Sequence, residues 1–289
     1  MKYITPNVIS FGSERNERSS VGHTFYNWLA SLLISKMCDI ELLHDPFKAD
    51  TAKFEPILNL GKHFKTINDV EFTKLVKLPN LDFGHRVINQ KVINSNIERV
   101  KQIVSDAEDG TVFVAEHGGQ FPGVLIDDSE FVCEILQDSY NNPQKFEYEK
   151  GKINIAVHIR RGDITERGNS DRWKNNQHYL QIIKDVKEKL GDRVKVFIFS
   201  EGHPLEFQMF TKEGCELVLG GSDIKTLDGF VNADILVTGH STFSLLAVYL
   251  NKSTIIYTPC LNFCRYDNFE SDRFIKYDEI LEKLCIENF

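Results

Sequence analysis

The sequence has 289 residues and a formal net charge of −8, from 34 Lys and Arg against 42 Asp and Glu. Such an acidic chain lacks the broad positive field that non-specific nucleic-acid binding requires and the basic excess that holds a protein on an anionic membrane. The length suits one large domain or two of ordinary size, and a hydrophobic fraction of 42% excludes general disorder. An anionic ligand must therefore be held by a few locally placed cations.

The N-terminal residues predict no targeting segment. They lack the basic stretch followed by an apolar stretch that marks a secretory signal, and the longest apolar run near them, at 28–34, is too short to span a bilayer. The six cysteines are spread along the chain without C-x-x-C spacing, which favours free thiols in a reducing compartment. We therefore expect a cytoplasmic protein without stable membrane insertion.

The first half of the chain predicts a domain of mixed helix and strand. A polar, proline-containing connection at 141–152 marks its end, so we place the two domains at 1–150 and 151–289. Apolar spacing and composition predict strands at 3–11, 40–43 and 111–115, and helices at 22–39, 94–105 and 131–138.

The second half alternates strands and helices regularly. The strands are apolar throughout, which indicates a parallel sheet covered by helices on both faces. The sequence predicts strands at 153–159, 194–200, 215–219, 233–238 and a final one at 254–257, helices at 178–190, 204–210, 222–232 and 241–250, and a closing helix at 278–288.

The first candidate site follows the strand at 153–159, which runs directly into two arginines. The residues read V-H-I-R-R-G-D and include His158, Arg160, Arg161 and Asp163. In an open parallel sheet, ligands bind outside the carboxyl ends of the strands, and the Arg fork is well shaped for bidentate phosphate binding. A lone Arg-Arg pair is also common on solvated surfaces, so these residues alone give only a candidate anion site.

The second candidate site is the loop T-G-H-S-T-F-S at 238–244, between a predicted strand and a predicted helix. Backbone N–H groups and hydroxyls at a helix start can bind an anion, although the same residues also serve as a plain N-cap through Ser241 or Thr242. Both candidate sites lie at strand ends of one predicted sheet. Together they predict a phosphate-bearing ligand such as a nucleotide.

Three blocks resemble the fucosyltransferase superfamily in their order and spacing. V-H-I-R-R-G-D is followed by F-I-F-S and then by A-D-I-L-V-T-G-H-S-T-F-S-L-L-A-V-Y-L-N, so the resemblance covers roughly residues 153–258. The superfamily comprises α1,2-, α1,6- and protein O-fucosyltransferases, and the α1,2 branch is nearest in the H-x-R-R-G-D and S-x-F-S blocks. The stretch around Gly22 and His23 resembles that branch's opening G-x-G-N-Q-x-F helix more loosely.

The resemblance implies an α/β protein of the GT-B type, with two Rossmann-like domains facing a cleft. Residues 1–150 would form the acceptor-side domain and residues 151–289 the nucleotide-sugar-binding domain, and the terminal helix can pack back on the first domain. The resemblance also implies an enzyme whose partners are a nucleotide-sugar donor, GDP-fucose, and a glycan acceptor.

The resemblance further implies roles for individual residues. Arg160 is expected to bind the β-phosphate of GDP-fucose and to support departure of GDP, with His158 beside the nucleotide and Arg161 and Asp163 shaping the same loop. The other expected substrate-binding residues are Ser241, Thr242, Phe243 and Ser244 at the diphosphate, Asp223 near guanine and ribose, and Gly22 and His23 in the N-terminal helix.

The expected chemistry is displacement at the anomeric carbon with inversion. Negative charge grows on the leaving diphosphate, so a fixed cation there stabilises the transition state more than the ground state. No Asp-x-Asp motif occurs in the sequence, which favours an arginine-based reaction without metal or other cofactor. Glu166, Asp163, His23 and Glu116 are candidates for the general base, and Glu166, just beyond the arginines, is preferred.

Two departures from the α1,2 pattern leave alternatives open. Val21-Gly22-His23 stands where that branch has Gly-Asn-Gln, and Leu245-Leu246 stands where it often has two tryptophans. Another nucleotide sugar, with rhamnose or galactose, therefore remains an alternative donor, and a non-catalytic nucleotide- or glycan-binding module is an alternative function. The chain lacks a G-x-G-x-x-G after a strand and a P-loop lysine motif, which disfavours the common nucleotide-binding α/β proteins. The sequence indicates neither the acceptor and its linkage nor the oligomeric state.

Overall fold

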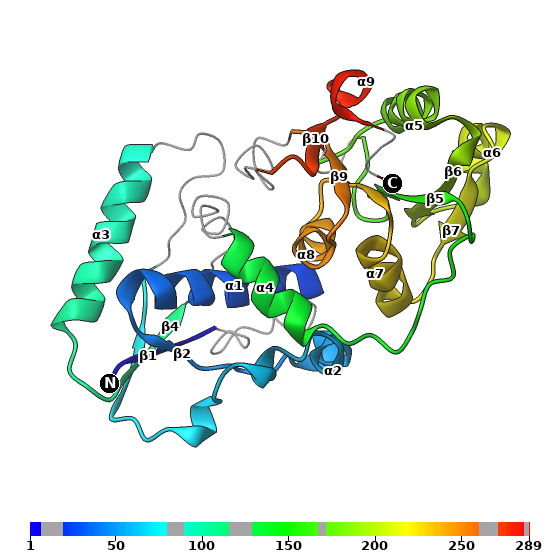
Figure 1. The fold of residues 1–289 in the computed structure, drawn as a ribbon. Helices are drawn as coiled ribbons and strands as arrows, with labels where there is room; N and C mark the ends of the chain where they lie inside the picture. The colour runs from blue at the N-terminus through cyan, green and yellow to red at the C-terminus, as the bar shows by residue number, and fades with distance from the viewer. Residues whose placement is uncertain (7–19, 80–89, 116–128, 167–171, 260–270, 286–288) are drawn as a thin grey trace. The chain divides into compact units, whose positions relative to one another are not determined.

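A computed structural model describes residues 1–6, 20–79, 90–115, 129–166, 172–259, 271–285 and 289. The chain divides into two compact units, Met1–Asn141 and Asn142–Phe289, each built on a parallel sheet with helices beside it (Figure 1). The predicted α/β class is therefore confirmed.

The first unit holds a four-stranded sheet in the order β2-β1-β4-β3. All neighbouring strands are parallel, and their bounds are β1 Tyr3–Pro6, β2 Glu41–Leu42, β3 Lys74–Lys77 and β4 Thr111–Ala115. Helix α1 (Val21–Cys38) packs against this sheet and buries Phe25, Trp28 and Leu29 completely. Because α1 is apolar on most of its surface, it forms the centre of this unit's core.

Shorter elements complete the first unit. His44, which is buried, pairs through Nε2 with Glu55 Oε1 at 2.7 Å, and the other oxygen of Glu55 accepts the N–H of Phe47. This pair holds the segment after β2 against a short helix. The remaining elements are η2 Ala49–Phe54, α2 Glu55–Leu58, η3 Leu60–Lys62, η4 Ile67–Asp69, α3 Gln90–Asp106 and α4 Ser129–Ser139.

The second unit holds a six-stranded parallel sheet in the order β10-β9-β8-β5-β6-β7. Taken from β7, the strands follow the doubly wound Rossmann order 3-2-1-4-5-6, and the direction of winding reverses between β5 and β8. The bounds are β5 Ile153–Ile159, β6 Val194–Ser200, β7 Glu216–Leu219, β8 Ile235–Val237, β9 Thr254–Tyr257 and β10 Phe274–Lys276. Such a reversal is the position at which open α/β sheets bind ligands.

Helices cover both faces of this sheet (Figure 1). On one face lie α5 (Asn176–Leu190), α6 (Gln208–Lys212) and α9 (Ile280–Lys283), and on the other lie α7 (Asp223–Val231) and α8 (Thr242–Leu250). Successive side chains of β5 point to opposite faces of the sheet. Val157 and Ile159 pack in the core on the α5 side, whereas His158 contacts α8 on the other side. None of the helices in the described part of the chain is both long and apolar enough to cross a membrane.

The C-terminal predictions need two corrections. The strand at 254–257 is not the last, because β10 pairs with it in parallel; three residues were too few to give a recognisable pattern. Of the closing helix predicted at 278–288, residues 286–288 lie outside the described residues, and the described part forms only the four-residue α9, which packs against α5. The helix predicted at 204–210 begins as the 3₁₀ helix η7 (Pro204–Phe207) and continues as α6.

The segment 142–150 packs on the second unit. The Phe146 ring lies 5.0 Å from that of Phe199, and its N–H donates to Asp228 Oδ2 at 2.8 Å. The Tyr148 hydroxyl donates to the Gly229 carbonyl, and a Cβ at Gly229 would lie 2.7 Å from the Phe199 ring. These contacts hold the segment against β6 and α7.

Asn251 directly follows α8 and is fully buried, and its side chain hydrogen-bonds to the end of α7. Its amide donates to the carbonyls of Phe230 and Ala233, and its Oδ1 accepts the N–H of Ser253.

Asn251→Ala should lower the free energy of unfolding by about 2–4 kcal/mol, because buried polar groups lose their partners. Urea unfolding followed by circular dichroism measures this. The control is Asn232→Ala, at an exposed position, which should lower the free energy of unfolding by less than about 1 kcal/mol. An equal loss of stability in both variants would contradict the role of the buried Asn251 side chain.

Candidate functional site

The candidate site lies where the winding of the second sheet reverses. Strands β5 and β8 pair in parallel, with Val157 opposite Val237, so the residues that follow each strand emerge side by side. The loop after β5 begins at Arg160, and the loop after β8 leads into α8. The structure therefore brings the two sequence-predicted loops to one edge of the sheet.

A buried hydrogen bond joins the end of β5 to the first turn of α8. It connects His158 Nδ1 with Ser244 Oγ, and both residues are almost completely buried. Burial, and then the nearby charge of Arg160, lower the pKa of His158 to about 3. His158 is therefore a neutral, fixed imidazole at neutral pH and a positioning group, and Arg160 lies within electrostatic reach of it.

Two glycines allow the loops to come this close. A Cβ at Gly239 would lie 2.8 Å from the backbone oxygen of His158, which is closer than real contacts allow. Gly162 has a φ of +78°, and a Cβ there would lie 1.9 Å from Glu201 Oε2, in the residue after β6. A larger residue at position 239 would separate the loop after β8 from β5, whereas one at position 162 would be strained by its positive φ and would displace the Glu201 side chain.

The two adjacent arginines have different surroundings. Arg160 pairs with Asp163, three residues along the same loop, and about a third of its side chain is exposed. Arg161 donates to the carbonyls of Arg160 and Lys174, both at 2.9 Å, and to Asn176 Oδ1 at 2.5 Å. Since Arg161 is committed to this network, Arg160 is the better placed of the two to meet a bound anion.

The start of α8 supplies hydrogen-bond donors next to this cation. Ser241 is the N-cap residue, and its Oγ accepts the Phe243 N–H at 3.2 Å. The hydroxyl of Ser244 belongs to the buried bond with His158, and Thr242 is also buried. The group that α8 offers an anion is therefore its N-terminal backbone, with its partial positive charge, more than the Ser244 hydroxyl.

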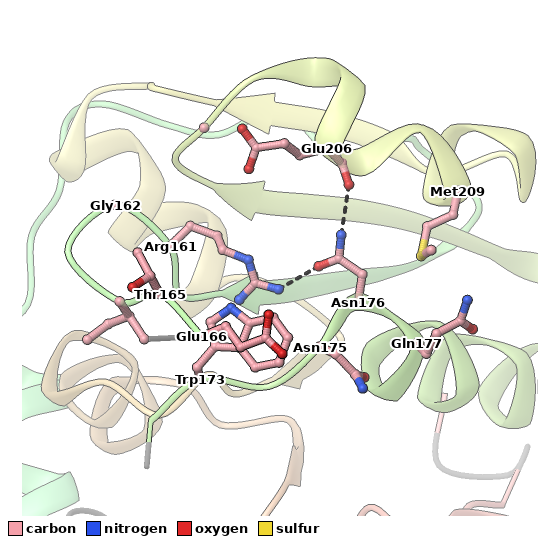
Figure 2. Close-up of a pocket in the computed structure, with 12 residues that line it drawn as sticks. Arg161, Gly162, Thr165, Glu166, Trp173, Asn175, Asn176, Gln177, Glu206 and Met209 are labelled. Atoms are coloured by element: carbon pink, nitrogen blue, oxygen red, sulfur yellow. Dashed lines mark hydrogen bonds between the residues drawn. The ribbon is translucent and has the colours of Figure 1, made fainter. Parts of the chain in front are cut away.

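A cavity of about 600 Å³ lies beside the loop after β5 (Figure 2). Arg161, Gly162 and Glu166 of that loop line it, together with residues from the start of α5, η7 and α6. The dashed bonds in Figure 2 run from Arg161 to Asn176 and from Asn176 to the backbone oxygen of Glu206. The remaining lining residues are Ile164, Thr165, Trp173, Asn175, Gln177, Gly202 and Met209.

The other sequence-predicted residues lie elsewhere. Asp223 is exposed in the first turn of α7, where its charge suits the helix dipole. Gly22 and His23 belong to the first turn of α1 in the first unit, and His23 Nδ1 lies 2.8 Å from Ser20 Oγ. Glu116 lies outside the described residues.

Sequence reasoning missed most of the cavity. Its lining comes from three separate segments whose spacing has no motif. One signal was present, because Trp173 is one of only two tryptophans and stands in a polar stretch just before a helix. A large aromatic ring in such a position marks a possible contact for a ligand.

The described part of the chain contains no group of three or more His, Cys, Asp or Glu side chains arranged to hold a metal ion. Positive charge at the candidate site comes from the Arg160 side chain and the start of α8.

Comparisons with known proteins give distant likenesses only. No family model matches the sequence, and no curated protein matches it significantly. Among solved structures, the chain is similar to POFUT1 in complex with GDP-fucose, at a TM-score of 0.45 and 13% identity over 89% of this chain and 96% of that one. It is also similar to the fucosyltransferase NodZ from Bradyrhizobium, at a TM-score of 0.44 and 11% identity over 86% and 93% of the two chains. At TM-scores this low, the functional proposal has to rest on the residues of this chain.

The buried imidazole makes stability depend on pH. The pKa of His158 in the folded protein lies below its ordinary value of 6.5. The neutral, buried imidazole therefore contributes its full stabilisation above pH 6.5, and this stabilisation is lost as the pH falls toward 3. Between pH 7 and pH 5 the loss should be about 2 kcal/mol. His158→Asn keeps a polar partner for Ser244 but does not titrate, so its unfolding free energy in urea should fall less over this range. Equal losses in both proteins would contradict the buried neutral state.

Proposed function

We propose that this chain is an inverting, metal-independent glycosyltransferase that transfers fucose from GDP-fucose to a hydroxyl of a glycan. The observation that carries the proposal is the position of Arg160. It follows β5 at the reversal point of a Rossmann sheet, two residues after the histidine that is bonded to α8. The block around it, V-H-I-R-R-G-D, is the one that resembles the fucosyltransferase superfamily.

Arg160 acts on the leaving group in this proposal. The acceptor oxygen forms a bond to the anomeric carbon while the bond from that carbon to the β-phosphate oxygen breaks, and GDP departs with the electron pair. The charge that develops on the phosphate is stabilised by the Arg160 guanidinium and the first-turn N–H groups of α8. Asp163 orients Arg160 through its ion pair.

Glu166 accepts the proton of the acceptor hydroxyl in this proposal. It is exposed, lies six positions after Arg160 in the same loop and lines the cavity of Figure 2. Among the described residues, it makes no hydrogen bond or ion pair, so its carboxylate is available to an incoming hydroxyl. A carboxylate within hydrogen-bond distance of the attacking oxygen is the simplest base for such a step.

Arg160→Ala should lower kcat for transfer from GDP-fucose by about 100- to 1,000-fold, because the developing phosphate charge loses its cation. The assay is release of GDP in the presence of a glycan acceptor mixture. Arg160→Lys should recover part of the rate. The matched control is Arg193→Ala, an exposed arginine just before β6 and so at the opposite end of the sheet, which should leave kcat unchanged.

The same assay separates the alternatives. Near wild-type transfer by Arg160→Ala would exclude the leaving-group role. Turnover of a rhamnose or galactose nucleotide, with none of GDP-fucose, would exclude fucose as the sugar. Binding of GDP without turnover of any donor would show a nucleotide-binding module instead of an enzyme.

Glu166→Gln should lower kcat by about 100-fold or more and leave the Kd for GDP unchanged, because the amide cannot accept the proton and the diphosphate site is intact. Calorimetry measures GDP binding, and the GDP-release assay measures kcat. Glu188→Gln, at an exposed position of α5, is the matched control. A variant at Glu166 with undiminished kcat would assign the base to another residue.

A further inference from the structure

The cavity of Figure 2 is separate from the predicted diphosphate position, although the same loop borders both. Arg160 does not line it, and neither do the residues of α8. It is closed instead by the start of α5 and by η7, which belong to the α5 face of the sheet. A ligand held by these lining residues alone would contact neither Arg160 nor α8.

The charges around the cavity disfavour an anion. The lining residues include two carboxylates, those of Glu166 and Glu206, and one guanidinium, that of Arg161; Glu206 Oε1 accepts the His203 N–H. Three N–H groups of Arg161 are already donated to protein oxygens, so its hydrogen-bonding capacity is largely used. A phosphate or carboxylate placed here would meet more negative than positive charge. The occupant should therefore be uncharged or cationic.

The remaining lining favours an uncharged sugar. The guanidinium carbon of Arg161 lies 5.4 Å from the centre of the Trp173 ring, which holds this half-buried indole in place. The C–H face of a sugar ring packs well on an indole, and its hydroxyls need donors and acceptors around the edge. Gln177 and Glu166 supply these, and neither makes a hydrogen bond within the part of the chain that the structure describes.

We infer that this cavity, which lies in the second unit and not in the acceptor-side domain expected at 1–150, binds a neutral sugar ring, stacked on Trp173, as the acceptor subsite of the proposed glycosyltransferase. The inference rests on the proposed function and adds where the acceptor lies and which class of sugar it is. A volume of about 600 Å³ accommodates one or two sugar rings. Glu166 lies in the cavity wall, so a hydroxyl bound there meets the proposed base on the loop that also carries Arg160.

The two tryptophans make a direct test possible. Trp28 is fully buried in α1 of the first unit, so a change in emission on adding a sugar reports Trp173. The probes are the methyl glycosides of galactose, glucose and N-acetylglucosamine, with methyl glucuronide as the matched anion. At least one neutral glycoside should change the emission saturably, and methyl glucuronide should bind about tenfold more weakly than methyl glucoside or not at all.

Variants localise the binding. Saturation-transfer NMR with the best neutral glycoside should show loss of binding in Trp173→Leu and a Kd raised about threefold or more in Gln177→Ala, whose exposed side chain is not needed for folding. Leu205→Ala is the control, because Leu205 is 71% exposed and does not line the cavity. Absence of saturable binding by every neutral glycoside, or tighter binding of methyl glucuronide, would overturn the inference.

Titration with GDP in the same samples separates this inference from the proposed function. Binding of GDP without binding of any glycoside overturns the sugar cavity alone. Binding of a glycoside at Trp173 without binding of GDP supports the cavity and overturns the proposed donor.

Discussion

The candidate site depends on the buried hydrogen bond between His158 and Ser244. These residues are far apart in the sequence, and the bond brings the carboxyl end of β5 against the start of α8. The close approach requires a glycine at position 239, because a Cβ there would clash with the backbone oxygen of His158. Burial lowers the pKa of His158, so the imidazole at this contact is neutral. Because Arg160 is only two residues beyond His158, the same bond places a guanidinium near the N-terminus of a helix. In the proposed function, these two weak anion-binding features act together on the diphosphate.

The two arginines of the motif, Arg160 and Arg161, make different contacts. Arg161 holds the loop to the start of α5 and supports the indole of Trp173, whereas Arg160 is held only by Asp163 among the residues described and remains partly exposed. An enzyme that transfers a sugar needs both a cation for the leaving phosphate and a neutral surface for the acceptor. In the proposed function, this net acidic chain meets the first need with positive charge confined to a short loop and a helix end.

Much of the second unit was predictable because its strands are continuous apolar runs, and 153–159 and 194–200 match β5 and β6 residue for residue. In the first unit, β3 had no such signal, since most of its side chains are exposed at a sheet edge. The motif pointed to His158 and Ser244, but not to their bond, because the sequence does not show which polar groups are buried together. The cavity around Trp173 was not predictable, since packing alone assembles it from three segments.

The proposed reaction requires the diphosphate to lie at the reversal point between β5 and β8. A crystal structure of the protein with GDP-fucose would locate it. We expect the diphosphate between the Arg160 guanidinium and the first turn of α8, with the cavity beside Trp173 free of phosphate. A diphosphate bound in that cavity, or one without contact to Arg160, would contradict the proposed reaction.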